Sequence, residues 1–298
     1  MYVSLIGYNT TNFIIALELI RRGFKVDILY EKISKKIKTT RTIGISKNNF
    51  KFLSSNLKQI SKYSWPITRI KIFNQKNNHD EFLNFSNENT KNFFLIKYTN
   101  LFNLLEIACK KSKKINFKLV ANKEIEKLEN KNKYDFIINS DNKNILTKKH
   151  FNKVIKKDYN SSAFTGILHH YKITNNTAVQ IFTKYGPLAF LPLSQTKTSI
   201  VYSVEKKYNL EIKDIKKIIL EFNKVYKVKK IDELEKFDLK FSFSREVSYN
   251  NILCFGDQMH KIHPLAGQGF NMTIRDIKIL IKLIDEKINC GLEINETL

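Results

Sequence analysis

One stretch of this sequence decides its fold. Residues 254–276 read Cys254-Phe-Gly-Asp-Gln-Met-His-Lys-Ile-His-Pro-Leu-Ala-Gly-Gln-Gly-Phe-Asn-Met-Thr-Ile-Arg-Asp276. An apolar run from Ile252 to Phe255 predicts a short buried strand that ends at Gly256. Pro264 stiffens the loop that follows. Beyond that loop, four isoleucines recur at helical spacing and predict a helix with one apolar face: Ile274, Ile277, Ile281 and Ile284.

Two glycines stand where this helix is expected to begin. The first backbone N–H groups of a helix have no partner within it, so a helix start is well suited to hold negative charge. Gly267 and Gly269, with Gln268 between them, are therefore predicted to present N–H groups to an anionic ligand. Asp257, at the end of the preceding strand, can accept hydrogen bonds from a ligand hydroxyl.

The whole stretch resembles the second flavin-binding motif of aromatic-ring flavoprotein monooxygenases, and is most similar to that of the hydroxylases of ubiquinone biosynthesis. The matching residues are Gly256, Asp257, His260, His263, Pro264, Gly267, Gln268, Gly269, Asn271, Arg275 and Asp276. The resemblance implies a bound FAD, and all of these except His260, His263, Arg275 and Asp276 are predicted to contact it. It also implies catalytic positions at Pro264, as a rigid wall beside the flavin ring, and at His263, which would position dioxygen or substrate. A purely structural role for His263 is an equal alternative.

The N-terminus supports a dinucleotide fold. Residues 2–6 predict a strand, 13–22 a helix and 25–30 a second strand that ends at Glu31. Such a fold has a glycine-rich turn after its first strand and an acidic residue for the ribose hydroxyls after its second. Gly7 and Glu31 are therefore predicted to bind the cofactor. Asn9 and Asn12 replace the other two glycines, and asparagine is the best substitute where the backbone is left-handed.

Three further residues are predicted to contact the cofactor, each through the same resemblance. Arg41 matches an arginine that lies near the flavin in the family, although Thr39 replaces an acidic neighbour, and a solvated arginine is the alternative. Asn103, on a helix expected over residues 100–108, occupies the position of a polar flavin contact. Asp141 matches the acid of an Ala-Asp-Gly motif that is tied to the flavin and to the nicotinamide donor, while Ser140 and Asn142 depart from it.

The second half of the chain reads as a sheet. Alternating apolar residues predict strands over 164–171, 178–184, 188–193 and 199–204. Residues 185–194 read Tyr-Gly-Pro-Leu-Ala-Phe-Leu-Pro-Leu-Ser, which resembles the segment of the ubiquinone hydroxylases whose sheet faces the flavin ring. Leu188, Phe190 and Leu191 are therefore predicted to line a pocket for an aromatic ring, and a core role is the alternative for each.

Together these patterns predict an α/β fold with two interleaved domains. The resemblance implies a Rossmann-like FAD-binding domain of the glutathione-reductase type, made of residues 1–65, 95–155 and 246–298. Residues 66–94 and 156–245 form a smaller, mainly antiparallel β-sheet domain that binds the substrate.

Composition excludes several other classes of protein. Hydrophobic content of 42% indicates a globular chain, and no stretch approaches the roughly 18 apolar residues of a membrane span. The N-terminus reads as a strand, so no signal peptide is expected. Three widely spaced cysteines indicate a reducing compartment, without disulfides or a metal site. The formal charge of +24 comes from lysines scattered through every element, which favours an anionic membrane surface over a nucleic acid as partner.

The resemblance implies a function. The protein is expected to be a FAD-dependent monooxygenase that uses NAD(P)H and dioxygen to hydroxylate the ring of a polyprenylated phenol in ubiquinone biosynthesis. We expect it in the cytoplasm, at the inner face of the cytoplasmic membrane, in contact with its lipid-tailed substrate and with other ubiquinone-synthesis proteins. The altered turn after Gly7 leaves a second hypothesis, a non-catalytic relative that serves as a scaffold or regulatory subunit of such an assembly.

Overall fold

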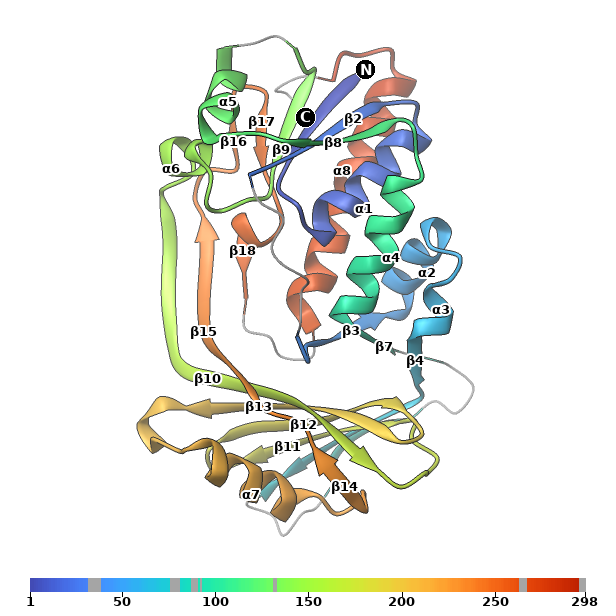
Figure 1. Ribbon diagram of the computed structural model, residues 1–298, viewed down its shortest axis with the longest axis vertical. Coiled ribbons are helices and arrows are strands. Elements are labelled where there is room, and N and C mark those ends of the chain that lie inside the picture. The colour runs from blue at the N-terminus through green and yellow to red at the C-terminus, as the bar shows by residue number, and fades with distance from the viewer. Residues whose placement is uncertain are drawn as a thin grey trace.

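The computed structural model describes residues 1–31, 39–75, 81–86, 91, 93–130, 133–262 and 267–294. Its upper part is a mainly parallel sheet flanked by helices, and its lower part is a large, mainly antiparallel sheet with one helix beneath it (Figure 1). The predicted α/β class with its two kinds of sheet is confirmed. Within the described ranges, no helix is long and apolar enough to cross a membrane.

The upper sheet has the strand order β16–β17–β9–β1–β2–β8. Its members are β1 (Tyr2–Ile6), β2 (Lys25–Tyr30), β8 (Ile115–Leu119), β9 (Phe136–Asn139), β16 (Ser248–Tyr249) and β17 (Ile252–Cys254). All neighbours pair in parallel except β16 with β17. The central strands β1, β2 and β9 are buried on both faces because helices cover both sides of a parallel sheet.

Three long helices pack on one face of this sheet (Figure 1). They are α1 (Thr10–Arg21), α4 (Tyr98–Lys110) and α8 (Gln268–Asn289), and their apolar stripes bury Phe13, Leu105 and Ile277 in the core with Val3 and Leu5 of β1. On the other face, α5 (Asn122–Glu126), the 3₁₀ turn η2 (Lys127–Asn130) and α6 (Ile145–His150) form a second core. The alternation of side chains along β1 explains why Leu5 lies in one core and Ile6 in the other.

A small antiparallel sheet lies between the two large ones. Its order is β3–β7–β4, from β3 (Thr42–Ser46), β7 (Phe93–Lys97) and β4 (Ser64–Ile67). Two short helices, α2 (Lys47–Asn56) and α3 (Ile60–Tyr63), connect β3 to β4. Ser46 stands at the start of α2, and its side chain makes no capping hydrogen bond.

The lower sheet has nine strands. Eight follow the order β18–β15–β10–β13–β12–β11–β5–β6, and β14 pairs with β10. The members are β5 (Arg69–Asn74), β6 (Glu81–Ser86), β10 (Val154–His170), β11 (Thr177–Thr183), β12 (Gly186–Ser194), β13 (Lys197–Glu205), β14 (Val228–Ile231), β15 (Glu235–Ser244) and β18 (His260–Lys261). Helix α7 (Ile212–Phe222) packs beneath it, and the 3₁₀ turn η3 (Lys206–Tyr208) precedes that helix. The long strands β10 and β15 run from the upper part into the lower one (Figure 1).

The middle of the chain passes from one sheet to another. Residues 65–73 are divided at Thr68 between β4 and β5, which belong to different sheets. The backbone N–H groups of Thr68 and Arg69 both donate to the carbonyl oxygen of Asn176, and this contact holds the chain where it changes sheet. The polar segment 74–91 contains the strand β6. Local pattern does not reveal which sheet supplies a partner strand.

Candidate active site

Four predicted residues meet at one edge of the upper sheet. Gly7 follows β1, Glu31 follows β2, Asp141 follows β9 and Gly256 follows β17, and these four strands run in parallel. Their carboxyl ends therefore point to the same edge, where open α/β sheets bind their ligands. A 3₁₀ turn, η4 (Gly256–Gln258), carries Asp257 at this edge with its side chain exposed.

The turn after β1 fits closely against the turn after β9. Gly7 has a φ of +121°, and a Cβ atom there would lie 3.1 Å from Ser140 Oγ and 3.3 Å from Asp141 Cβ. Its N–H donates to the carbonyl oxygen of Leu29 at 2.9 Å. A glycine is needed at this position because the backbone conformation and the space both exclude a side chain.

Asn9 and Asn12 do not occupy left-handed backbone positions, so that expectation is corrected. Asn9 is extended, with φ −150° and ψ 168°, and Asn12 lies inside α1. Asn9 Oδ1 instead accepts a hydrogen bond from the N–H of Asn12 at 3.0 Å, which caps the helix, and its Nδ2 donates to Ser140 Oγ at 2.8 Å. Asn12 Nδ2 donates to the carbonyl oxygen of Gly7 at 2.8 Å. The two asparagines thus hold the turn in shape by side-chain hydrogen bonds.

The start of α1 keeps two free donors. The backbone N–H groups of Thr10 and Thr11 have no acceptor within the described part of the chain. They lie in the first turn, where the helix dipole favours negative charge. Gly256 packs against this turn, because a Cβ on it would lie 3.1 Å from Thr11 Oγ1. An anion can therefore approach the N–H groups of Thr10 and Thr11 from the edge of the sheet at which the parallel strands end.

Tyr98 gathers three groups around the same helix start. Its ring lies 5.6 Å from the Arg41 guanidinium carbon, and its N–H donates to the Arg41 carbonyl oxygen at 3.0 Å. Burial raises the pKa of Tyr98, a hydrogen bond with the Thr10 side chain and the Arg41 charge act to lower it, and Asp257 acts to raise it. The Thr10 side chain and the Arg41 guanidinium therefore lie beside Tyr98, and Arg41 supplies positive charge near the start of α1.

The start of α8 is fixed to β3. Asn271 Nδ2 donates to the carbonyl oxygens of Gly44 at 2.7 Å and Gly267 at 3.0 Å. Its Oδ1 accepts from the N–H of Ser46 at 3.0 Å and from Asn49 Nδ2 at 2.9 Å. Because every polar group of this buried side chain is bonded within the protein, Asn271 can act on a cofactor only by positioning the helix start.

A histidine–carboxylate contact joins the preceding turn to α8. His260 Nε2 lies 2.5 Å from Asp276 Oδ2, and His260 is buried. This contact fixes the strand β18 against the helix on either side of the motif loop. His263 and Pro264, the two predicted catalytic positions, lie outside the described residues, and their roles stay predictions.

The remaining predicted cofactor contacts are placed as follows. Gln268 is the first residue of α8 and is exposed, and Gly269 follows it, where an added Cβ would lie 3.7 Å from Ile262 Cγ1. Glu31 is partly buried at the end of β2. Asp141 Oδ1 accepts a hydrogen bond from the N–H of Lys143 at 2.9 Å. Asn103 is exposed on α4. Their roles as cofactor contacts stay predictions.

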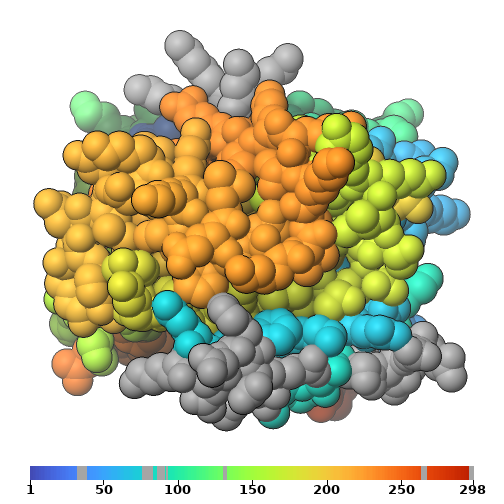
Figure 2. All heavy atoms as spheres, turned by 90° about the horizontal axis from the view of Figure 1, so that it is seen from below, coloured from blue at the N-terminus to red at the C-terminus, as the bar shows by residue number. Residues whose placement is uncertain are grey.

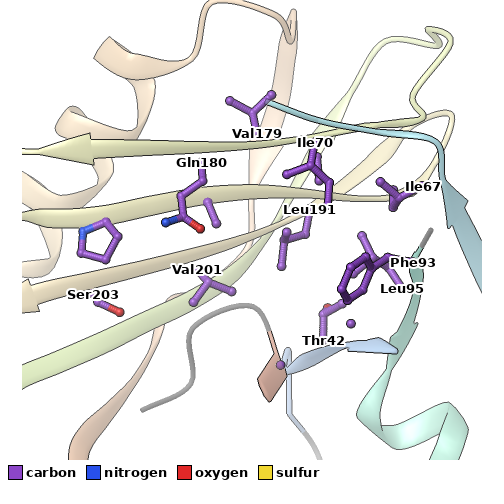
Figure 3. A pocket seen from close by; sticks show the side chains of 15 residues that line it. Thr42, Ile67, Ile70, Phe93, Leu95, Val179, Gln180, Leu191, Val201 and Ser203 are labelled. Carbon is purple, nitrogen blue, oxygen red and sulfur yellow. The ribbon is translucent and has the colours of Figure 1, made fainter. Parts of the chain in front are cut away.

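An apolar cavity lies between the lower sheet and the small sheet. Its empty volume is about 840 Å³, with open solvent at its mouth included. Figure 3 shows Gln180, Leu191, Val201 and Ser203 of the lower sheet on one side and Thr42, Phe93 and Leu95 of the small sheet on the other. None of the described residues that line it carries a charge. Gly44 and Gly267 also line it, so the cavity reaches the start of α8.

The predicted pocket residues divide between the two faces of β12. Leu191 lines the cavity, together with Pro187 and Ala189. Leu188 and Phe190 do not: they are buried on the opposite face, in the core with α7. The expectation for these two is wrong because side chains alternate along a strand, so that neighbours in sequence cannot share a face.

Sequence reasoning missed several residues of this site. Thr10, Thr11 and Tyr98 surround the start of α1, and Thr42 lines the cavity with a buried hydroxyl that has no partner among the described residues. His260 and Asp276 were noted only as motif letters. The spacing of Asn9 and Asn12, which matches an N-cap and its third helical residue, was a signal for the capping role.

The site fits FAD. Free N–H groups at the start of α1, with Arg41 beside them, suit a pyrophosphate. Gly7 has no side chain, so the turn after β1 leaves the pyrophosphate free to approach the strand ends. The start of α8 and the apolar cavity beside it suit the planar ring system. A parallel sheet with these two helix starts, walled by an antiparallel sheet, defines a flavin-binding oxygenase fold.

Comparison with known proteins agrees with a FAD site. The model of a family described as "FAD binding domain" matches residues 172–290. Over that part the chain matches the FAD-binding domain family, and its similarity to curated proteins is to FAD-dependent monooxygenases. It is 28% identical over 164 residues to the mitochondrial ubiquinone biosynthesis monooxygenase COQ6 of Mus musculus, and 29% over 165 residues to that of Rattus norvegicus. These matches cover 41% and 42% of this chain and 34% and 35% of the relatives, so the chain spans about a third of the length of the curated proteins that it matches.

Solved structures share the fold at low sequence identity. The probable FAD-dependent monooxygenase pqsL of Pseudomonas aeruginosa superposes with a TM-score of 0.71 at 11% identity, over 97% of this chain and 87% of that one. The p-nitrophenol 4-monooxygenase PnpA of Pseudomonas putida gives 0.72 at 12%, over 97% and 80%. CtdE, solved in complex with FAD and a substrate, gives 0.69 at 13%, over 94% and 80%.

Proposed function

We propose that this protein hydroxylates the aromatic ring of a polyprenylated phenol in ubiquinone biosynthesis, as a FAD-dependent monooxygenase that uses NAD(P)H and dioxygen. The names of the COQ6 relatives support the pathway, and the family supports the cofactor. When bound, FAD supplies the acceptance of a hydride from NAD(P)H and the activation of dioxygen.

One observation carries the proposal: an uncharged cavity ends at the start of α8. Its described walls are apolar apart from Thr42, Gln180 and Ser203, and no lysine, arginine or carboxylate is among the described residues that line it. A cavity of this kind favours a neutral ring over a charged one, since burying an unpaired charge is costly. A phenol matches it, because its ring is apolar and its single hydroxyl can bond to one of the three polar residues.

The protein's own groups have distinct tasks in this proposal. The N–H groups of Thr10 and Thr11 and the Arg41 guanidinium hold the pyrophosphate. The N–H groups at the start of α8 stabilise negative charge on the cofactor ring, and the apolar walls exclude water from the reaction. Asn271 and the His260–Asp276 pair keep the start of α8 at a fixed position. His263 and Pro264 remain the proposed catalytic residues of the loop.

The proposed surroundings follow from charge. A net charge of +24 attracts the protein to anionic lipid, and we place it at the inner face of the cytoplasmic membrane, where a lipid-tailed phenol is available. Contacts with other ubiquinone-synthesis proteins are part of the same proposal.

The experiment is a turnover assay with isotopic oxygen. Purified, FAD-loaded protein is mixed with NADH or NADPH, 2-geranylphenol and ¹⁸O₂, and the products are analysed by mass spectrometry. The proposal expects phenol-dependent oxidation of the nicotinamide and a product that has gained one ¹⁸O atom. Flavin that binds but is never reduced by NADH or NADPH, with or without the phenol, would support the non-catalytic alternative.

A further inference from the structure

The cavity-facing side of the lower sheet continues beyond the cavity. Cross-strand partners in a sheet project their side chains to the same face. Ala189 pairs with Gln180, Gln180 pairs with Ile72, and Ile72 pairs with Leu83. Ala189 and Gln180 line the cavity, whereas Leu83 lies on the edge strand β6. One row of side chains therefore leads from the cavity wall to the edge of the sheet.

A second row also reaches the edge strand. Ala178 pairs with Ile70, and Ile70 pairs with Phe85 of β6. In a third row, Pro187 of the cavity pairs with Phe182 of β11, which pairs in turn with Asn74 of β5. All three rows thus begin at residues that line the cavity, and each carries a large apolar side chain beyond it.

The large apolar side chains of these rows that lie beyond the cavity are exposed. Leu83 is 44% exposed, Phe85 53% and Phe182 43%. With the partly buried Ile72 they form what we call the outer shelf: Ile72, Leu83, Phe85 and Phe182. Single exposed apolar residues are common on any protein, but three in adjacent rows that continue an apolar cavity are not. The strands of this margin, β5 and β6, form a cyan strip along one border of the lower face in Figure 2.

The shelf carries no charge. Arg69 and Lys71, the cations of β5, alternate with Ile70 and Ile72 and therefore project from the other face of the sheet. The cations of this strand, on a strongly basic chain, are thus kept off the face that continues the cavity.

We propose that the outer shelf binds the isoprenoid chain of the substrate while its ring occupies the cavity. The inference rests on the proposed function, and it assigns the chain a path: past Ile70 at the cavity wall, across Ile72, and over Leu83, Phe85 and Phe182. A linear apolar chain attached to a ring in the cavity must leave through the mouth, and the shelf is the apolar surface that continues from it. A ring without a chain leaves the shelf unused.

The test is a series of phenols of increasing chain length. Binding of 2-methylphenol, 2-prenylphenol and 2-geranylphenol to the FAD-loaded protein is measured by calorimetry. The wild type is expected to bind each longer homologue about fivefold more tightly, because each isoprene unit buries further apolar surface. The Leu83→Ser/Phe85→Ser variant is expected to lose this increase and to bind 2-methylphenol as the wild type does. Phe182→Ser alone is a second, milder variant and is expected to lose part of it.

The control variant removes a similar amount of exposed apolar surface from helix α7, away from the shelf. Ile212 and Leu220 of α7 are 46% and 47% exposed on the other side of the sheet, so Ile212→Ser/Leu220→Ser is expected to keep the full chain-length dependence. The proposal would be overturned if the wild type bound all three phenols with equal affinity, or if the Leu83→Ser/Phe85→Ser variant kept the rise in affinity with chain length. Either result would leave the proposed function intact. Absence of binding by every phenol would instead contradict the proposed function.

A membrane is the competing occupant of the shelf. Sedimentation with phosphatidylglycerol vesicles separates the two, since it needs no substrate. If the Leu83→Ser/Phe85→Ser variant loses vesicle binding but keeps the chain-length dependence, the shelf is a lipid contact and the proposal is wrong. Unchanged vesicle binding with loss of the chain-length dependence supports it.

Discussion

Gly267 and Gly44 meet backbone to backbone. A Cβ atom on Gly267 would lie 2.8 Å from the carbonyl oxygen of Gly44 and 3.0 Å from its nitrogen, and the φ of Gly267 is +71°. Gly267, the residue immediately before α8, is thereby fixed against β3, and both glycines line the cavity. The start of the helix that is proposed to face the flavin ring therefore forms one rigid wall with the small sheet.

Gly267→Ala is expected to damage both stability and flavin binding. The left-handed backbone costs a non-glycine residue about 1–2 kcal/mol, and the contact with Gly44 adds a clash with backbone that cannot move aside. We expect a loss of about 3 kcal/mol in the free energy of unfolding of the flavin-free protein and a FAD affinity at least about tenfold weaker. Gly291→Ala is the matched control, since Gly291 has φ +67° and nothing within 4 Å of an added Cβ. Equal effects of the two substitutions in urea unfolding would show that the Gly44 contact is unimportant.

Asn9→Asp separates helix capping from anion binding. Aspartate caps a helix as well as asparagine does, and its charge suits a free helix start, so the melting temperature of the flavin-free protein should not fall. The same charge opposes a pyrophosphate at the N–H groups of Thr10 and Thr11, and the Kd for FAD should rise at least about tenfold. Gln195→Glu, which adds one negative charge in an exposed turn after β12, is the control. If both variants bind FAD equally well, the pyrophosphate does not lie at the start of α1.

Ala189→Phe is expected to fill the cavity. Ala189 points into it from β12, and a phenyl group there would take up the space proposed for the substrate ring. Titration with 2-geranylphenol should show at least about tenfold weaker binding, while FAD stays bound. Ala189→Ser, which keeps the volume, should bind the phenol within about twofold of the wild type. Undiminished binding by the phenylalanine variant would place the substrate elsewhere.

The buried carboxylate of Asp27 makes the stability of the fold sensitive to acid. This carboxylate is fully buried in β2 and accepts hydrogen bonds from Lys118 Nζ at 2.5 Å and from the Tyr134 hydroxyl at 2.6 Å, with Tyr2 and Asn116 as further donors. Burial alone would raise its pKa, but the hydrogen bonds from Lys118, Tyr134 and Tyr2 outweigh burial and hold the pKa below the usual 3.8. Because the folded pKa is the lower one, the stabilisation is present above about pH 4 and is lost as the pH falls through the folded pKa.

Asp27→Asn should therefore destabilise the protein at neutral pH by about 2–4 kcal/mol, since it removes the charge from a buried pair and its donors. Urea unfolding at a series of pH values should show the difference between wild type and variant shrinking below about pH 4. Glu286→Gln, at a largely exposed pair with Lys282, should change stability by less than about 0.5 kcal/mol. A difference between wild type and Asp27→Asn that stays constant down to pH 2 would contradict this account.

From the sequence alone, the strand ends and helix starts that carry the site could be predicted better than the side-chain contacts within it. Gly7 and Glu31 were predicted from the strand–helix–strand pattern of the N-terminus, and Asp141 and Gly256 were predicted through the family resemblance. The structure places all four at the ends of parallel strands on one sheet edge. The face of β12 did not follow, because the register that turns Leu191 toward the cavity and Leu188 away from it depends on pairing with β11 and β13.

The asparagines show a second limit. Backbone preference suggested left-handed residues at Asn9 and Asn12, whereas the side chains instead bond to the helix start and to the Gly7 carbonyl. A partner such as Ser140, which is 131 positions away in sequence, cannot be found from local preference. The cluster of Tyr98, Arg41 and Thr10 is of the same kind, since three separate segments bring it together.

The most direct measurement is the amount of FAD that the purified protein holds. The protein is incubated with excess FAD and passed through a desalting column. Its visible spectrum is recorded before and after denaturation, and the released chromophore is identified. We predict about one FAD per chain, with absorption bands perturbed relative to free FAD. A protein that remains colourless under these conditions would contradict the assignment of the α1 and α8 helix starts as a flavin site, and with it the proposed function.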